Sequence, residues 1–111
     1  MGLAKFRVQA NRRAVERRRM HWGSYIAMPD ASLWMKCQTR DLSFAGARVQ
    51  MDELPNLPAA VYFLEMRDRL AYEANIVWRK APEIGLQFTK VYRFAEVPGA
   101  RLRELIEKVS G

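Results

Sequence analysis

The sequence predicts an all-β fold with a terminal helix, namely a six-stranded antiparallel β-barrel with a flexible basic N-terminal arm and a C-terminal amphipathic α-helix. Two patterns carry this prediction. From about residue 20 to residue 90, apolar and polar residues alternate with the period of two typical of β-strands, and turn-forming residues interrupt the alternation. Near the carboxyl end the period becomes helical. Short strands joined by short turns in a chain of 111 residues favour one barrel domain.

Six segments show the strand pattern. In order they are HWGSYIAM, SLWMKCQTRD, GARVQM, AVYFLEM, YEANIVWRK and IGLQFTK. Turn signals separate them at Pro29-Asp30, Ala45-Gly46, 55–58, Arg67-Asp68 and Ala81-Pro82. AVYFLEM is apolar on both faces, which is typical of a strand covered from both sides. In the others, alternation predicts these inward-facing groups: Leu33, Met35 and Cys37; Ala47, Val49 and Met51; Tyr72, Ala74, Ile76 and Trp78; Ile84, Leu86 and Phe88.

The two ends of the chain differ from this central region. After Pro98-Gly99, apolar residues recur at the i, i+3, i+4 and i+7 positions of a helix, at Leu102, Leu105, Ile106 and Val109. We therefore expect a helix over about residues 98–110 that packs against the barrel. Residues 1–19 are expected to form the arm, and residues 20–111 the barrel with its helix.

The charge is concentrated in the arm. The formal net charge is +7, and residues 1–20 hold seven basic residues and one acidic residue, a net +6. The other 91 residues hold twelve basic and eleven acidic residues, a net +1. Such an arm suits either a polyanion-seeking tail or a clamp for a small anion, and a solvated tail is the plain alternative.

The composition argues against an enzyme. His21 is the sole histidine and Cys37 the sole cysteine, so metal clusters and histidine-assisted catalysis lack their usual groups. Phosphate-binding glycine loops do not occur. We expect no catalytic residue, no metal and no cofactor. Because the sequence also contains no apolar run long enough to span a membrane and no secretory signal, we expect a cytoplasmic protein.

The stretch DLSFAGARV suggests a binding site. In an extended segment Asp41 and Ser43 point to one side, and a carboxylate beside a hydroxyl can accept the N1–H and exocyclic amine of a guanine. Gly46 lacks a Cβ, so the chain can turn there with positive φ and a flat ring can approach closely. A simple turn between two strands, held by Asp or Ser and closed by glycine, is the structural alternative.

Arginines in the arm complement this stretch. Arg13 and Arg17 are four residues apart, a spacing that lets two side chains converge on one anion. Guanidinium groups bind phosphate in a bidentate manner, stack on bases and read the O6/N7 edge of guanine.

The ordered motifs Arg13-x-x-x-Arg17 and Asp41-x-Ser43-x-x-Gly46 resemble those of the PilZ domain family, bacterial receptor modules for cyclic di-GMP. The resemblance extends through Gly46-Ala47-Arg48 and the later strand pair IVWRKAPEIGLQF, and it covers most of the chain. It implies a six-stranded antiparallel barrel with a carboxyl-terminal helix, in agreement with the pattern above.

The resemblance also implies roles for particular residues. Arg13 and Arg17 would wrap the phosphates and guanine edges, while Asp41 and Ser43 would bind a guanine and Gly46 would keep the turn open. Further candidates for ligand contact are Arg12, Arg18, Arg48 and Trp78. Binding would fold the arm onto the barrel, and a protein partner would then carry the signal to motility, adhesion or biofilm behaviour.

Two other functions stay open at this point. The chain could be a PilZ-type interaction module that binds no ligand, or a small basic RNA- or DNA-binding barrel. Against nucleic acid, the arm has no aromatic residue between Arg7 and Arg19 for base stacking. Trp78 shares the predicted inner face of Tyr72 and Ile76, so we interpret it first as a barrel-core or barrel-end aromatic and second as an aromatic wall near the ligand or a partner surface. Trp34 falls on a polar face, where an exposed aromatic would suit a partner contact.

Overall fold

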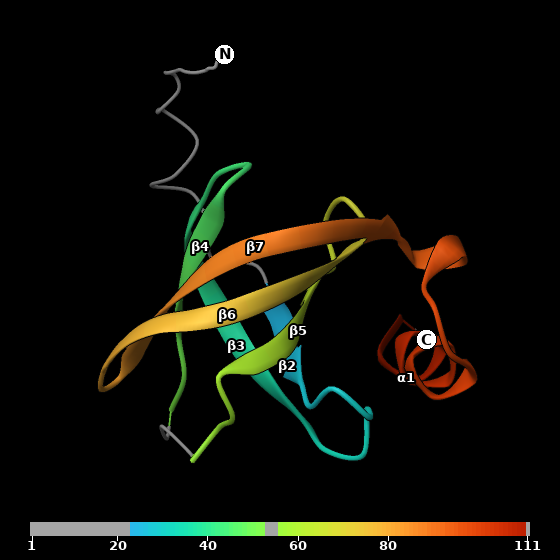
Figure 1. Ribbon diagram of the computed structural model, residues 1–111, viewed down its shortest axis with the longest axis horizontal. Helices are drawn as coiled ribbons and strands as arrows, with labels where there is room; N and C mark the ends of the chain where they lie inside the picture. Colours follow the sequence, from blue (N-terminus) through green and yellow to red (C-terminus); the bar gives the residue numbers. More distant parts are fainter. Residues whose placement is uncertain (1–22, 53–55, 111) are drawn as a thin grey trace.

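The computed structural model describes residues 23–52 and 56–110. In this part of the chain six strands, one 3₁₀ turn and one α-helix follow one another (Figure 1). Their bounds are β2 Gly23–Ala27, β3 Trp34–Leu42, β4 Gly46–Gln50, β5 Ala60–Glu65, β6 Leu70–Lys80, β7 Glu83–Arg93, η3 Phe94–Glu96 and α1 Ala100–Ser110. Residues 1–19, the expected arm, lie outside the described residues, as do the first two residues of the first predicted strand.

The strands close into an antiparallel barrel, as the sequence predicts. Their order around it is β2-β3-β4-β7-β6-β5, and β5 pairs with β2 to complete the ring. Closure leaves no exposed sheet edge to be covered. The order places β4 between β3 and β7, and that arrangement brings together side chains that are far apart in the sequence.

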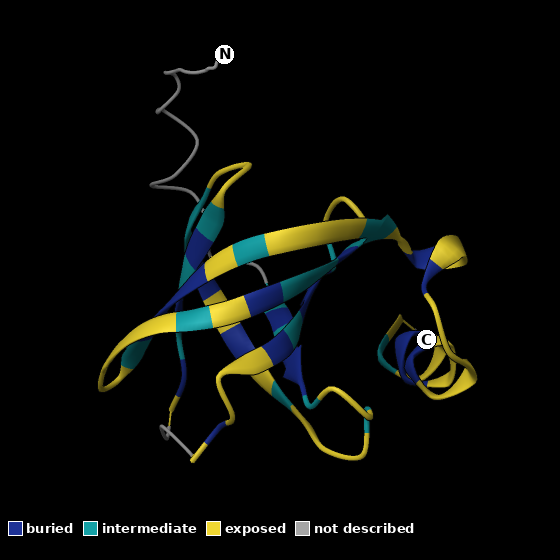
Figure 2. Ribbon diagram, viewed as in Figure 1, coloured by how far each residue is buried: buried dark blue, intermediate teal, exposed yellow. Residues whose placement is uncertain are grey.

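Alternation correctly predicts most of the barrel interior (Figure 2). Ala47, Val49 and Met51 are buried, as are Ile84 and Leu86, and all five belong to one core cluster. Tyr72 and Phe88 stack at 3.8 Å between ring centroids, next to Phe63 in that same cluster. Aromatic pairs of this kind add stability beyond the area that they bury.

Leu33 is an exception to the predicted alternation. It is expected on the inner face, but its side chain is 58% exposed. The reason is that Leu33 precedes β3 and belongs to the turn from Pro29, where its carbonyl accepts a hydrogen bond of 2.9 Å from the Met28 N–H. Its neighbour Trp34 is partly exposed, as predicted, and packs edge-on against Tyr25.

The predicted C-terminal helix is confirmed. It begins at Ala100, directly after Gly99, whose φ of 86° lies in the left-handed region open to glycine. Leu102, Leu105 and Ile106 are buried in a second cluster on the outside of the barrel. That cluster also contains Ala27, Leu64, Ala71, Phe94 and Val97. The helix therefore covers one flank of the barrel and leaves the β3–β4 hairpin uncovered (Figure 1). No helix in the described ranges is long and apolar enough to cross a membrane.

Polar groups inside the fold are hydrogen-bonded. Glu65, in the segment predicted to be covered on both faces, is fully buried, and its carboxylate accepts the backbone N–H groups of Arg67 at 3.2 Å and Asp68 at 2.8 Å. The hydroxyls of Ser24 and Thr39 lie 2.7 Å apart and are also fully buried. Such pairing offsets the cost of removing polar groups from water.

Candidate functional site

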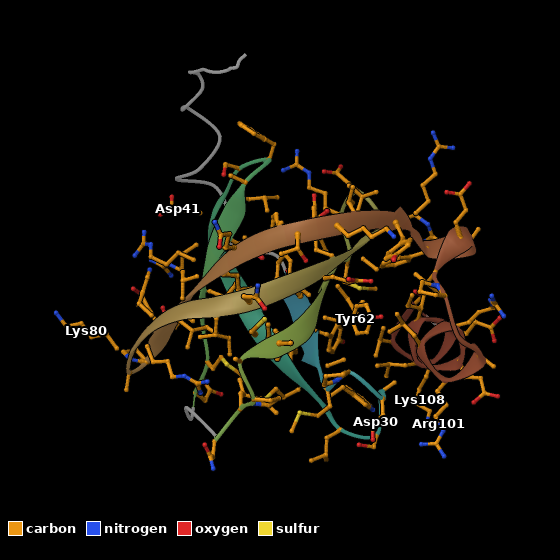
Figure 3. All side chains as sticks on the ribbon, viewed as in Figure 1. Asp30, Asp41, Tyr62, Lys80, Arg101 and Lys108 are labelled. Carbon is orange, nitrogen blue, oxygen red and sulfur yellow. The ribbon has the colours of Figure 1, made fainter. Side chains whose placement is uncertain are left out.

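A β-bulge directs Asp41 out of the barrel. Cys37 and Thr39 are buried, and strict alternation from them would point Asp41 inward as well. The register shifts between Thr39 and Asp41, however, because Thr39 pairs with Val49 and Asp41 with Arg48, so Arg40 is the extra residue. A bulge of this kind changes the face on which the following side chains lie. Asp41 is consequently half-buried on the outer surface, well away from the C-terminal helix that carries Arg101 and Lys108 (Figure 3).

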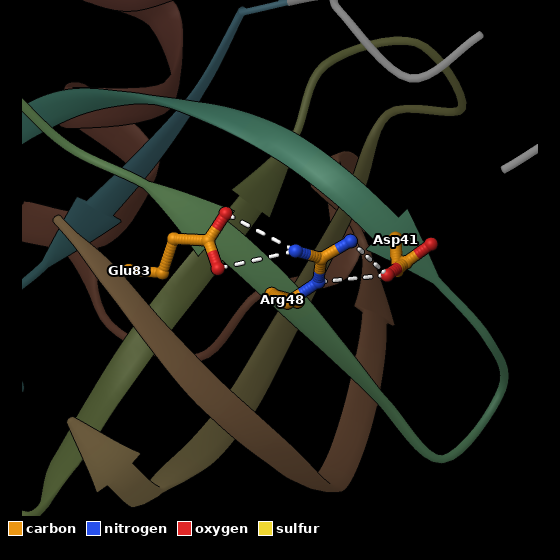
Figure 4. A network of polar contacts seen from close by, with 3 residues as sticks. All are labelled: Asp41, Arg48 and Glu83. Carbon is orange, nitrogen blue, oxygen red and sulfur yellow. Dashed lines mark hydrogen bonds and ion pairs between the residues drawn. The ribbon is translucent and has the colours of Figure 1, made fainter. Parts of the chain in front are cut away.

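Asp41 takes part in an ion-pair network with Arg48 and Glu83, which come from three adjacent strands (Figure 4). Arg48 donates Nε at 2.8 Å and Nη2 at 2.6 Å to the same oxygen, Oδ2 of Asp41. On its other side, Arg48 Nη1 donates at 3.1 Å to both carboxylate oxygens of Glu83. The hydrogen bonds to Asp41 and then to Glu83 raise the pKa of Arg48 above its ordinary value.

This network contributes more to geometry than to stability. The side chains of Arg48 and Asp41 are 41% and 35% exposed, and solvent-screened pairs of this kind contribute about 1 kcal/mol or less. Guanidinium hydrogen bonds are directional, however, so the fork of Arg48 fixes where the Asp41 carboxylate lies.

Ser43 forms the turn of the β3–β4 hairpin. Its Oγ accepts the backbone N–H groups of Ala45 at 3.2 Å and Gly46 at 3.3 Å, and its backbone N–H donates to the Gly46 carbonyl at 2.9 Å. The turn interpretation of this residue is therefore correct. Beside it at the tip of the hairpin, Phe44 has an 82% exposed side chain.

Gly46 is needed for close strand packing. The sequence suggests a positive φ here, and that expectation is wrong, since among the described glycines only Gly99 has one. A Cβ on Gly46 would instead lie 2.1 Å from the carbonyl oxygen of Leu86 in β7. The missing side chain thus lets β4 approach β7 next to the hairpin turn.

Trp78 is exposed, and its interpretation as a core aromatic is wrong. A second register shift lies between Ile76, which pairs with Leu86, and Trp78, which pairs with Gly85, so Val77 is the extra residue. This shift moves Trp78 to the outer face, where it is 41% exposed. Its indole lies over Gly85, because a Cβ on Gly85 would be 2.0 Å from Trp78 Nε1.

Both bulges direct their side chains to one open cleft of about 440 Å³, which we call the hairpin cleft. Its lining residues are Asp41, Leu42, Ser43, Gly46, Ala47, Arg48 and Trp78. Of the site residues predicted from sequence, five meet here, namely Asp41, Ser43, Gly46, Arg48 and Trp78. Arg12, Arg13, Arg17 and Arg18 lie outside the described residues.

Two structurally important residues were missed by sequence reasoning. Glu83 completes the ion-pair network, and Gly85 provides the seat for the Trp78 indole. Glu83 had no sequence signal, since it is one acidic residue after a Pro-containing turn. Gly85 had a weak one, because a glycine inside a strand often marks a close approach.

The sole cysteine of the chain, Cys37, does not line the hairpin cleft. Cys37 is buried in the barrel, and burial raises the pKa of its thiol to about 12, so it remains in the unreactive protonated form. Within residues 23–52 and 56–110, no cluster of three or more His, Cys, Asp or Glu side chains could hold a metal ion. What the cleft offers is a carboxylate, a guanidinium, a hydroxyl and an indole face, which are groups that recognise a planar polar ligand.

Comparison with known proteins connects this geometry to a family. The family model described as "PilZ domain" matches residues 11–107. A search of solved structures found the crystal structure of the PilZ domain of CeSA from a cellulose-synthesizing bacterium, with a TM-score of 0.51 and 21% sequence identity. That match covers 79% of this chain and 87% of the other, and at this identity it shows the likeness of the fold. A search of curated proteins found no match.

Proposed function

This chain belongs to the PilZ domain family, a family of cyclic di-GMP receptors, and we propose that it binds cyclic di-GMP in the hairpin cleft. One observation carries the proposal. Two independent bulges, in β3 and β6, turn Asp41 and Trp78 outward into the cleft that also contains Ser43 and Gly46. An exposed indole face beside a carboxylate is a combination suited to binding a planar polar ligand.

The cleft has the chemistry to hold one guanine. Asp41 is an acceptor for the N1–H and 2-amino donors, which lie side by side on the guanine edge. The exposed indole of Trp78 offers a flat face for the base, and base–aromatic stacking contributes about 1–3 kcal/mol per base. Gly46 lines the cleft next to the hairpin turn.

The phosphates of the ligand need charge from another source. The ion-pair network combines two carboxylates with one guanidinium, so it is net negative and would repel a dianion. The run of arginines at residues 12–19 is a source of opposite charge, and Arg13 and Arg17 have the spacing to converge on one phosphate. In this proposal they bind the phosphates, with Arg12 and Arg18 as neighbours, while the barrel reads the base.

The output is a change of surface. Binding would place residues 1–19 on the barrel next to the β3–β4 hairpin, and the free energy for that ordering would come from ligand contacts. A protein effector would then recognise the altered surface. Control of motility or biofilm behaviour is the output that the family suggests.

Calorimetric titration with cyclic di-GMP tests the proposal, with GTP and a short RNA as controls. We expect saturable binding to the cyclic dinucleotide alone, weakened about tenfold or more by Asp41→Ala and by Arg17→Ala. Asp30→Ala is a matched control, because Asp30 is an exposed carboxylate beside the helix, far from Asp41 (Figure 3).

Other results would exclude the proposal. Binding of RNA with a steep salt dependence would make the arm a nucleic-acid tail, since long polyanions release many counterions and a dianion few. If none of the three compounds binds, the remaining interpretation is a PilZ-fold module that binds only protein.

A further inference from the structure

We propose that Arg48 and Glu83 are positioning residues that hold the Asp41 carboxylate where it reads the 2-amino group of guanine. The inference rests on the proposed function and deepens it. In this inference, a network spanning three strands determines the preference for guanine over purines that lack the 2-amino group. Neither residue needs to touch the ligand for this role.

The first step is the contact between Arg48 and Asp41. The two residues are directly opposite each other in the register of β3 and β4. Arg48 directs Nε and Nη2 to a single carboxylate oxygen, Oδ2. Because the guanidinium is planar and rigid, two donors on one oxygen restrict both the position and the rotation of the carboxylate.

Arg48 is itself held in place by Glu83. Its side chain is 41% exposed, and an arginine on the surface loses substantial rotamer entropy when it is confined to one geometry. Glu83 provides the opposing anchor, with both carboxylate oxygens 3.1 Å from Nη1. Since β4 lies between β3 and β7, Glu83 and Asp41 hold the guanidinium from opposite sides (Figure 4).

The third step concerns charge. With Glu83 ionised, the network keeps a net negative charge after the pairing of Arg48, so a donor-rich ligand edge is favoured at Asp41. Neutralising Glu83 as glutamine removes that excess charge and weakens the second anchor of Arg48, because an amide offers one acceptor oxygen in place of two. Both effects weaken recognition of the amino donor at Asp41. The reduced repulsion of the phosphates is the same for ligands with and without the amino group, so it does not change the preference between them.

The experiment compares cyclic di-GMP with its inosine analogue, which keeps O6, N7, N1–H and the phosphates and lacks only the 2-amino groups. Affinities are measured for the wild type, Glu83→Gln and Arg48→Lys. The first variant removes the charge and keeps the shape, and the second keeps the charge and loses the fork. Glu104→Gln, an exposed residue of α1, is the charge-matched control.

The expected result is a change of selectivity. The wild type and Glu104→Gln should prefer the guanine ligand by about 10- to 100-fold, the range for one hydrogen bond to a charged group. In Glu83→Gln and Arg48→Lys the preference should fall to about threefold or less, because cyclic di-GMP loses the contact of its 2-amino group with Asp41 and the inosine analogue has no such contact to lose. A merely structural defect would lower both affinities by the same factor and leave the preference unchanged, and thermal unfolding confirms that each variant is folded.

The experiment distinguishes failure of the positioning role from failure of the proposed function. If the wild type binds cyclic di-GMP with the stated preference and both variants retain it, the positioning role is wrong and the proposed function stands. If the wild type binds neither nucleotide, the proposed function is wrong and the positioning role is wrong with it.

Discussion

The indole of Trp78 occupies the space that a side chain would take on Gly85. These residues are directly opposite each other in β6 and β7, and a Cβ on Gly85 would lie 2.0 to 2.6 Å from three indole atoms. Because Gly85 has no side chain, the indole can occupy this space, and the contact orients the wall of the hairpin cleft.

We expect Gly85→Ala to displace Trp78 without unfolding the barrel. The clash involves a surface side chain that can rotate away, so the free energy of unfolding should change by about 1 kcal/mol or less. Affinity for cyclic di-GMP should fall by about as much as in Trp78→Ala, because base stacking on the indole contributes about 1–3 kcal/mol. Calorimetry measures the affinity, and denaturant unfolding measures the free energy of unfolding. Unchanged affinity in Gly85→Ala would show that the contact between Gly85 and the Trp78 indole does not affect ligand binding.

Gly46→Ala, in contrast, should lower the stability of the barrel. Its new Cβ would meet the backbone carbonyl of Leu86 at 2.1 Å, and no side-chain rotation relieves that clash. Separating β4 from β7 should lower the free energy of unfolding by about 1–3 kcal/mol. The matched control is Gly23→Ala, whose Cβ would meet only the flexible end of Lys36 at 3.1 Å. Equal unfolding midpoints for both variants would contradict this explanation of Gly46.

Glu65→Gln should destabilise the barrel. The carboxylate is fully buried and accepts two backbone N–H groups, whereas an amide would turn a donor toward one of them. Leaving a buried donor unsatisfied costs about 1–3 kcal/mol, which thermal unfolding can detect. Glu96→Gln, at an exposed position, should unfold like the wild type.

Stability should fall in alkali because of Cys37 and Tyr72. Burial raises the pKa of Cys37 from 9.0 and that of Tyr72 from 10.0, both to about 12. Both groups hold their protons more tightly when folded, so their contribution is fully present below pH 9 and is lost as the pH rises from 9 to 12. Where only the unfolded form of one group is ionised, the free energy of unfolding should drop by about 1.4 kcal/mol per pH unit.

Denaturant unfolding at several pH values measures that slope, and Cys37→Ala should reduce it between pH 9 and 10. In the folded protein at pH 8, Cys37 should also resist alkylation until denaturant is added. Rapid labelling without denaturant would show that the thiol is accessible.

The barrel and its helix could be predicted from the sequence because both depend on local periodicity. Ala47, Val49 and Met51 alternate with polar residues and are buried, and the helical spacing from Leu102 to Ile106 marks the face that packs on the barrel. In each pattern the apolar residues lie on the buried side of the element and the polar residues on the side that meets water. The period at which they recur can therefore be read along the chain.

The motif residues of the site could also be named from sequence, but their faces could not. Strict alternation of side chains along each strand would place Asp41 and Trp78 inside the barrel, whereas in the structure both lie on the outside. The difference arises from one extra residue in each strand, Arg40 and Val77, and a bulge exists only relative to the partner strand.

The sequence by itself thus determined the fold class, most of the core and the chemical identity of the residues that line the hairpin cleft. Only the tertiary structure decided which face they occupy, that Glu83 joins Arg48 from β7, and that Gly85 supports Trp78. The physical reason is that these relationships depend on strand register and barrel closure. Both are set by pairing between segments far apart in the chain, as between β4 and β7, and local periodicity carries no information about that pairing.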